Sequence, residues 1–118
     1  QLAEVAVAMS EGAAVMAPLL PIGALMSLLR EARLMVSGDT GPTHIAGALG
    51  IPIVAAYGPT DPARNGPWDE NDIVLSRYDE CACHYDRRCR VPDRWCLGGL
   101  QAPELMAAIT ARLEAAGR

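Results

Sequence analysis

The chain has 118 residues and a mass of 12.5 kDa, enough for one small domain with a modest core. Its residues are 51% hydrophobic and its formal net charge is −4, which argues against a disordered chain and against a nucleic-acid-binding surface. No apolar run approaches the roughly 18 residues that a membrane-spanning helix needs, and no signal-peptide pattern opens the chain. We therefore expect a soluble, cytoplasmic protein.

The first third of the chain is predicted to alternate helix and strand. Residues 1–10 are apolar on most faces and lack an N-cap, which is typical of the end of a helix that starts further upstream. Residues 14–19 are predicted to form a strand, which Pro18 restricts to an edge position or a strand end. Residues 21–33 begin with proline and carry apolar side chains at helical spacing, so they predict a helix that packs on the core.

Two buried strands with a helix between them follow. Residues 34–37 and 51–57 are apolar without polar alternation, as is typical of strands covered on both faces of a parallel sheet. Pro42 favours a helix over residues 42–49, and Gly50 is placed to end that helix in the left-handed conformation. The order of elements predicts an α/β fold, with a Rossmann-like parallel sheet and flanking helices joined by right-handed crossovers.

The last third is predicted to add one strand and one helix. Residues 72–75 are apolar and short, as in a final strand. Residues 101–116 carry leucine and isoleucine at four-residue spacing after a proline, which indicates a helix that packs back across the sheet or toward a missing half. Trp68 is expected to close its loop onto the domain rather than stack on a base.

The turn after the first of these buried strands is the candidate ligand site. Ligands of open α/β sheets bind outside the carboxyl ends of the strands, where a helix start offers unpaired amides and the positive end of its dipole. We expect the amides of residues 43–45 to bind an anion, with phosphate as the preferred occupant. Gly41 allows close approach, the hydroxyls of Thr40 and Thr43 add donors, and the imidazole of His44 reaches the same anion.

Two further side chains extend this prediction. The carboxylate of Asp39 would repel a phosphate, so we expect it to accept hydrogen bonds from sugar hydroxyls or from loop amides. Arg64 lies in the loop after the second buried strand, where its guanidinium could face the same phosphates or simply be solvated. The alternative for the whole segment is a structural turn that caps a helix without binding anything.

Three segments with fixed spacing carry a family resemblance. They are D-T-G-P-T-H-I-A at residues 39–46, A-L-G-I-P at 48–52 and Y-G-P-T-D-P at 57–62. Together they resemble glycosyltransferase family 9, the heptosyltransferases that build the inner core of lipopolysaccharide. The R-N-G-P-W segment at residues 64–68 and the later cysteines also fit the C-terminal half of that family.

The resemblance implies that residues 1–118 are part of the C-terminal, nucleotide-sugar-binding domain of a GT-B glycosyltransferase. The donor would be a nucleotide-diphosphate sugar such as ADP-heptose, held without a metal, and the acceptor would be lipid-linked or a glycan. The catalytic base would belong to an N-terminal acceptor domain absent from this chain, so the chain alone would be inactive. The implied donor-binding residues are Asp39, Thr40, Gly41, Pro42, Thr43, His44, Thr60 and Arg64.

A cysteine-rich loop is predicted at residues 80–97. Its four cysteines are Cys81, Cys83, Cys89 and Cys96. They fit a structural zinc site with His84 as a further ligand, a disulfide, or reduced structural thiols. The resemblance places this cluster outside the donor pocket, so no catalytic metal and no required cofactor are expected.

The same loop is rich in arginine. Its basic residues are Arg87, Arg88, Arg90 and Arg94. They could meet an anionic acceptor or the inner face of the bacterial inner membrane, or form a solvated surface. Two other functions remain open: a non-enzymatic nucleotide- or zinc-binding module, and another GT-B enzyme such as an epimerase, which the spacing from Asp39 to His44 disfavours.

Overall fold

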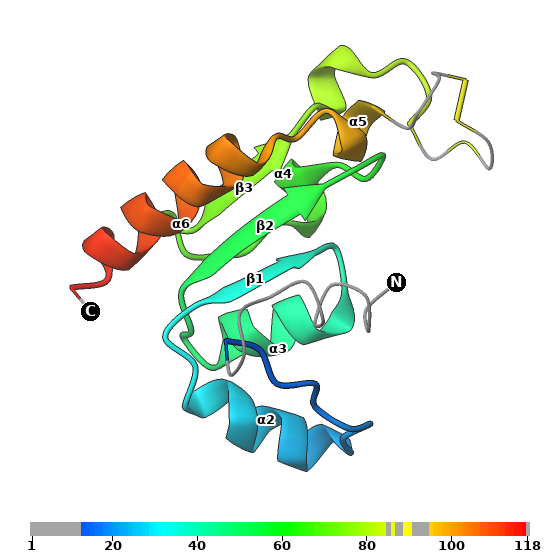
Figure 1. Cartoon of the computed structure of the whole chain (residues 1–118). Helices are drawn as coiled ribbons and strands as arrows, with labels where there is room; N and C mark the ends of the chain where they lie inside the picture. The colour runs from blue at the N-terminus through cyan, green and yellow to red at the C-terminus, as the bar shows by residue number, and fades with distance from the viewer. Residues whose placement is uncertain (1–12, 85, 87–88, 91–94, 118) are drawn as a thin grey trace.

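The computed structural model describes residues 13–84, 86, 89–90 and 95–117 (Figure 1). The helix predicted at residues 1–10 lies outside them. In chain order the elements are α2 (Ile22–Arg30), β1 (Met35–Gly38), α3 (Gly41–Ala48), β2 (Ile53–Tyr57), α4 (Pro62–Asn65), β3 (Ile73–Ser76), the 3-10 turn η1 (Tyr78–Glu80), α5 (Trp95–Gly98) and α6 (Ala102–Ala115). Within this part of the chain, no helix combines the length and the apolar character needed to cross a membrane.

The three described strands form one parallel sheet in the order β1-β2-β3. Val54 in the central strand lies opposite Val36 on one side and Ile73 on the other. Helices α2 and α3 cover one face and α6 crosses the other (Figure 1). The predicted α/β class, with a parallel sheet and flanking helices, is therefore confirmed.

The core lies between the sheet and the helices α2 and α3. Its buried members are Leu29, Ala46, Ile51, Ile53, Ala55 and Tyr57. Val54 is buried on the opposite face, so β2 is covered on both sides, as its unalternated apolar sequence predicts. The same prediction is wrong for β1, where Val36 is 44% exposed on the face that α6 covers at β2 and β3.

The predicted strand at residues 14–19 is wrong. Residues 14–21 have no regular secondary structure, and Val15 and Leu19 are exposed. The prolines at 18 and 21 remove two backbone donors, which weakens any ladder this segment could join. A strand also needs a partner edge, and apolar composition alone cannot supply one.

The helix predicted at residues 21–33 forms, but it ends three residues early, at Arg30. The amides of Glu31 and Ala32 donate to the carbonyls three residues back, at 3.2 and 2.9 Å, and so tighten the last turn. The following helix ends as predicted, because Gly50 has a φ of +70°. Its end is closed by the amide of Ile51, which donates to the carbonyl of Ala46.

The last strand and helix form close to their predicted bounds, and α6 packs across β2 and β3. One buried residue of α6 was not predicted: Arg112, whose Nε donates to Asp72 Oδ1 at 2.8 Å. The same carboxylate oxygen accepts from the amide of Ile53 at 2.7 Å. An Arg112 terminal nitrogen also lies 3.3 Å from Asp69 Oδ2. This ion-pair group joins α6 to the beginning of β2.

Candidate functional site

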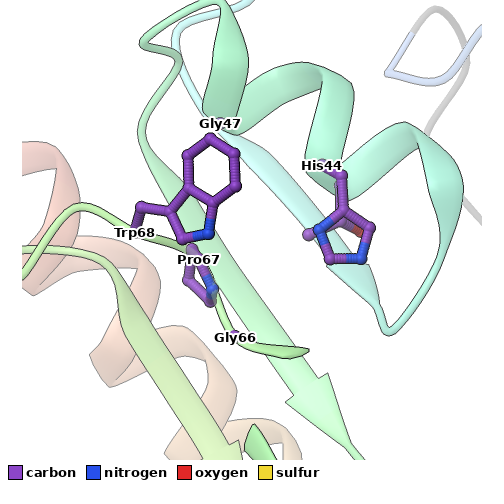
Figure 2. Close-up of a pocket in the computed structure, with 6 residues that line it drawn as sticks. His44, Gly47, Gly66, Pro67 and Trp68 are labelled. Carbon is purple, nitrogen blue, oxygen red and sulfur yellow. The ribbon is translucent and has the colours of Figure 1, made fainter. Parts of the chain in front are cut away.

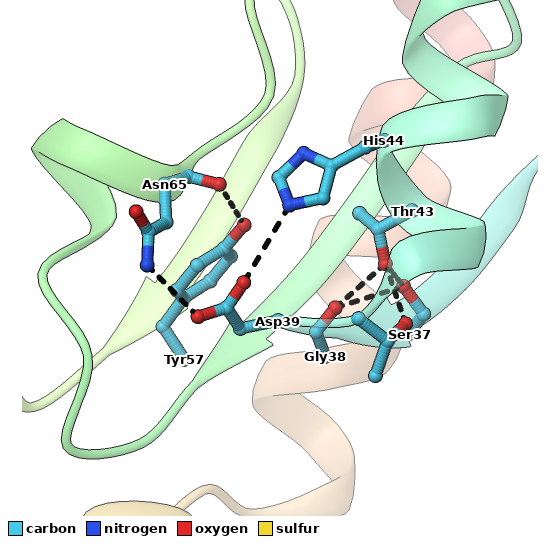
Figure 3. A network of polar contacts seen from close by, with 8 residues as sticks. Ser37, Gly38, Asp39, Thr43, His44, Tyr57 and Asn65 are labelled. Atoms are coloured by element: carbon cyan, nitrogen blue, oxygen red, sulfur yellow. Dashed lines mark hydrogen bonds and ion pairs between the residues drawn. The ribbon is translucent and has the colours of Figure 1, made fainter.

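Polar side chains from two loops meet where β1 and β2 end (Figure 3). Asp39 follows β1, and its Oδ2 accepts a hydrogen bond from the side-chain amide of Asn65, at the end of α4, at 3.1 Å. His44 in α3 places Nε2 3.6 Å from the other carboxylate oxygen, Oδ1. The carboxyl ends of parallel strands therefore bring these groups to one edge of the sheet, where α/β proteins bind ligands.

The carboxylate of Asp39 is held in its charged form. Burial raises its pKa, but side-chain hydrogen bonds from Thr60 and Asn65, together with the field and hydrogen bond of His44, outweigh burial, and the pKa lies below the usual 3.8. The side chain is 23% exposed. An ionised carboxylate with part of its surface open can accept hydrogen bonds from an incoming hydroxyl group.

The imidazole of His44 is an accessible polar group of this edge. Its side chain is about half exposed and faces both Asp39 and solvent (Figure 3). An imidazole in this position can donate to an anion or to a hydroxyl oxygen while the carboxylate beside it orients the ring.

The hydroxyl of Thr43 faces the interior, so the expectation that it donates to a ligand is wrong. Thr43 is 1% exposed, and its hydroxyl donates to the carbonyl of Gly38 at 2.6 Å. It also contacts the hydroxyls of Ser37 and Thr40. Even its amide is used, since it donates to the carbonyl of Thr40 at 3.1 Å. Thr43 lies on the sheet-facing side of α3 and fixes the turn.

The remaining predicted residues of this turn keep open surface. Thr40 and Gly41 are exposed, and a methyl group added at Gly41 would meet no atom within 4 Å. Pro42 lies in the first turn of α3, as its fixed φ favours. The backbone at the start of α3 can therefore be approached closely by a ligand.

Two residues that hold Asp39 in place were not singled out from the sequence. The buried hydroxyl of Tyr57 donates to the backbone carbonyl of Asn65 at 2.6 Å, and the Asn65 side chain then reaches Asp39 (Figure 3). Burial and the nearby charge of Asp39 both raise the pKa of Tyr57, so it remains a neutral donor. Both residues lie in the Y-G-P-T-D-P and R-N-G-P-W segments, which were the available signal.

The short helix α4 positions Asn65. Asp61 caps it by accepting from the amide of Ala63 at 2.8 Å. Gly66 ends it by donating its backbone N–H to the carbonyl of Pro62 at 2.7 Å, and a methyl group at Gly66 would lie 2.4 Å from that oxygen. Among the described residues, the polar contact from α4 to Asp39 comes from Asn65. Arg64, which was predicted to face the phosphates of a ligand, is exposed.

Trp68 does not close the loop onto the domain, so that expectation is wrong. Its side chain is 88% exposed. It lines one side of a shallow pocket, with Pro67 beneath and His44 on the other side (Figure 2). The Gly66 hydrogen bond to Pro62 and the restricted backbone of Pro67 define the turn before Trp68, and the indole is at the surface.

The cysteine-rich loop reaches the turn after β2 through α5, where Leu97 lies against Gly58. Cys81, Cys83 and Cys96 are buried and Cys89 is exposed. The Sγ atom of Cys83 lies 3.3 Å from that of Cys81 and 3.7 Å from that of Cys89, and none of the four forms a disulfide. Within the described residues, no group of three or more histidine, cysteine, aspartate or glutamate side chains is arranged to hold a metal ion.

The thiols of this loop differ in acidity. A backbone hydrogen bond from Cys83 lowers the pKa of Cys81, but the hydrogen bond to the Cys83 thiol, burial and nearby thiols raise it overall. Hydrogen bonds from the Arg90 backbone and the Cys81 thiol lower the pKa of Cys83. His84 stacks on Tyr78, with ring centroids 3.7 Å apart, instead of facing the sulfur atoms.

Only one of the four arginines predicted for an anionic partner is described. Arg90 is exposed and forms an ion pair with Asp86 at 2.8 Å. The expectation for Arg87, Arg88 and Arg94 lies outside the described residues.

The structure is thus a parallel α/β sheet with an accessible polar cluster at the carboxyl ends of adjacent strands, the position at which α/β proteins bind ligands. The sequence profile of glycosyltransferase family 9 (heptosyltransferase) matches residues 1–94. The chain therefore belongs to this family. No solved structure matches the chain.

Curated relatives agree with this assignment. The chain is 34% identical over 79 residues to lipopolysaccharide heptosyltransferase 1 of Pseudomonas aeruginosa, covering 67% of this chain and 22% of the relative. It is 38% identical over 58 residues to lipopolysaccharide core heptosyltransferase OpsX of Haemophilus influenzae, covering 49% and 17%. For lipopolysaccharide heptosyltransferase 1 of Escherichia coli K12, the identity is 37% over 57 residues, covering 48% and 18%. The aligned region is thus less than a quarter of each relative.

Proposed function

We propose that this chain is the donor-binding part of an inverting GT-B glycosyltransferase. The protein would transfer a heptose from a nucleotide-diphosphate sugar, of the ADP-heptose type, to a lipopolysaccharide core or related glycan acceptor. Family membership and the names of the relatives support the reaction class. The observation that carries the donor assignment is the meeting of Asp39, His44 and Asn65 at the carboxyl ends of β1 and β2.

The two halves of a nucleotide sugar would use different parts of this edge. The diphosphate would lie over the exposed start of α3, at Thr40 and Gly41, where the helix dipole favours an anion. The ionised Asp39 would repel phosphate and would accept sugar hydroxyls instead. His44, between these groups, could donate to either of them. Thr60 and Asn65 would keep the carboxylate oriented, and Arg64 would remain a candidate phosphate contact.

The chemistry follows from where charge develops. When the bond between the sugar and the diphosphate breaks, negative charge grows on the leaving diphosphate. Donors that are already fixed around that group stabilise the transition state more than the ground state. His44 and the start of α3 would provide this stabilisation without a divalent cation. We assign no catalytic base to this chain, and we expect the chain alone to bind a donor nucleotide weakly and to transfer nothing.

Calorimetric titration of the chain with ADP and with other nucleoside diphosphates, with and without chelator, tests the proposal. We expect His44→Ala to weaken ADP binding about 10- to 100-fold, because a hydrogen bond to a charged group contributes roughly 1.5–3 kcal/mol. Thr110→Ala, on the exposed surface of α6, is the control and should leave affinity unchanged. Binding that is insensitive to His44→Ala, or that requires a divalent cation, would contradict the proposal.

A zinc-binding module is the alternative function. The close approach of the Cys83 sulfur to those of Cys81 and Cys89 favours it, whereas the arrangement of the described metal-ligating side chains does not. Metal analysis of protein purified without chelator distinguishes the zinc-binding module from the donor-binding domain. Stoichiometric zinc together with no nucleotide binding would support the alternative.

A further inference from the structure

Trp68 is a large aromatic residue that projects from a well-defined backbone turn into solvent. The turn before it is fixed, because the Gly66 amide donates to the carbonyl of Pro62 at 2.7 Å and Pro67 restricts the next backbone angle. The indole is nonetheless 88% exposed. Tryptophan combines a large apolar ring with a polar N–H, which suits it to contacts with a ligand or partner.

The surroundings of the indole indicate which ligand. Trp68 and His44 lie on two sides of one shallow pocket that Gly47 and Pro67 also line (Figure 2). On its far side His44 approaches Asp39, whose carboxylate is ionised and partly open. A continuous surface therefore runs from an aromatic plane to an imidazole and on to a carboxylate.

This combination matches the chemistry of a sugar ring. A pyranose has a C–H face that packs on an aromatic plane and a rim of hydroxyls that need hydrogen-bond acceptors and donors. A phosphate would be repelled by Asp39, and an acyl chain would find polar groups along its path. A nucleobase would stack on the indole, but it would leave the hydroxyl-binding carboxylate unused.

We propose that the indole of Trp68 stacks on the apolar face of the sugar ring whose hydroxyls reach His44 and Asp39, and so selects for the glycosyl part of the donor. This inference rests on the proposed function, because it places the sugar beside the diphosphate-binding turn. It assigns to Trp68 a binding role that the sequence did not predict.

The test uses the two tryptophans of the chain, Trp68 and Trp95. In a Trp95→Phe background, the remaining emission reports on Trp68 alone. We expect ADP-glucose, as an accessible ADP-sugar probe, to shift or quench this emission, and ADP to leave it nearly unchanged. Equal responses to ADP and ADP-glucose would place the base on the indole and overturn the proposal, as would no response to ADP-glucose while calorimetry shows that it binds.

Affinity measurements provide the second readout. Trp68→Ala should weaken ADP-glucose binding about 3- to 10-fold, as expected for one stacking contact, and leave ADP binding unchanged. Trp68→Tyr should retain most of the affinity because it keeps an aromatic plane. Unchanged ADP-glucose affinity in Trp68→Ala would overturn the inference while leaving the proposed function intact. Failure of the parent chain to bind ADP at all would instead count against the proposed function, and with it this inference.

Discussion

Two aspartates near opposite ends of the central strand β2 show how similar chemistry serves different purposes. The side chain of Asp72, near the beginning of β2, is 2% exposed and forms an ion pair with Arg112. Asp39, beyond the carboxyl ends of the strands, is 23% exposed and is bound by neutral donors, with the half-exposed His44 at 3.6 Å. Burial beside an arginine makes the first carboxylate structural. Partial exposure beside weaker partners leaves the second able to bind a ligand.

The buried pair should give the largest effect on stability. Arg112→Met removes the cation and leaves Asp72 buried without its counter-charge, which should lower the free energy of unfolding by about 3–5 kcal/mol. Urea denaturation measures this. Arg90→Ala, which breaks an exposed ion pair with Asp86, is the control and should cost less than about 0.5 kcal/mol. A similarly small loss of unfolding free energy in both variants would show that the Arg112–Asp72 ion pair is not shielded from water.

Substitution of the partly exposed Asp39 should affect ligand binding more than stability. Asp39→Asn should weaken ADP-glucose binding about 10- to 100-fold, since hydrogen bonds to a charged acceptor contribute roughly 1.5–3 kcal/mol. The free energy of unfolding should change by less than about 1 kcal/mol, because the site is partly solvated. Calorimetry and urea denaturation on the same protein give both values. Asp79→Asn, an exposed control, should change neither. A large loss of stability with unchanged affinity would make Asp39 structural, like Asp72.

A smaller effect on stability is expected at Tyr57, whose hydroxyl donates to the backbone of Asn65. Tyr57→Phe deletes the hydroxyl that donates to the Asn65 carbonyl at 2.6 Å. The free energy of unfolding should fall by about 0.5–1.5 kcal/mol, the usual net contribution of one such hydrogen bond. Thermal denaturation beside Thr110→Ala, which removes an exposed hydroxyl from α6, measures the difference. Identical transitions in the two variants would show that Tyr57 does not hold α4.

The change in stability with pH that is due to Asp39 should be the smallest of these effects. The folded pKa of Asp39 lies below the usual 3.8, so its charged network contributes fully above about pH 4 and is lost as pH falls through the folded value. The stability difference between the parent chain and Asp39→Asn should therefore be the same at about pH 7 and pH 5, and should shrink near pH 3. A difference that disappears between pH 7 and 5 would mean that the pKa is raised instead.

Local sequence signals predicted the central strand–helix–strand unit well. An unbroken apolar run, a proline and a glycine fix β2, the start of α3 and the left-handed residue Gly50 without distant help. The placement of Asp39 and His44 at the carboxyl end of β1 was also predictable, because one follows that strand directly and the other lies in the first turns of α3. These features depend on backbone chemistry within a few residues.

The features that were predicted wrongly, or not predicted, depend on contacts between distant parts of the chain. The direction of the Thr43 hydroxyl depends on how α3 is rotated against the sheet, which spacing alone does not fix. Arg112 and Asp72 are 40 positions apart, and a helical arginine usually indicates a solvated face. Asn65 gained its role only when α4 brought it against Asp39.

The contact between Leu97 and Gly58 joins the cysteine-rich loop to the turn after β2. A methyl group on Gly58 would come within 3.2 Å of Leu97 Cγ, so the turn leading to Thr60 rests directly on α5. Leu97 directly follows the buried Cys96. An adduct at Cys96 that displaced α5 would therefore disturb the turn that leads to Thr60, and through that turn the edge of the sheet where Asp39 and His44 lie.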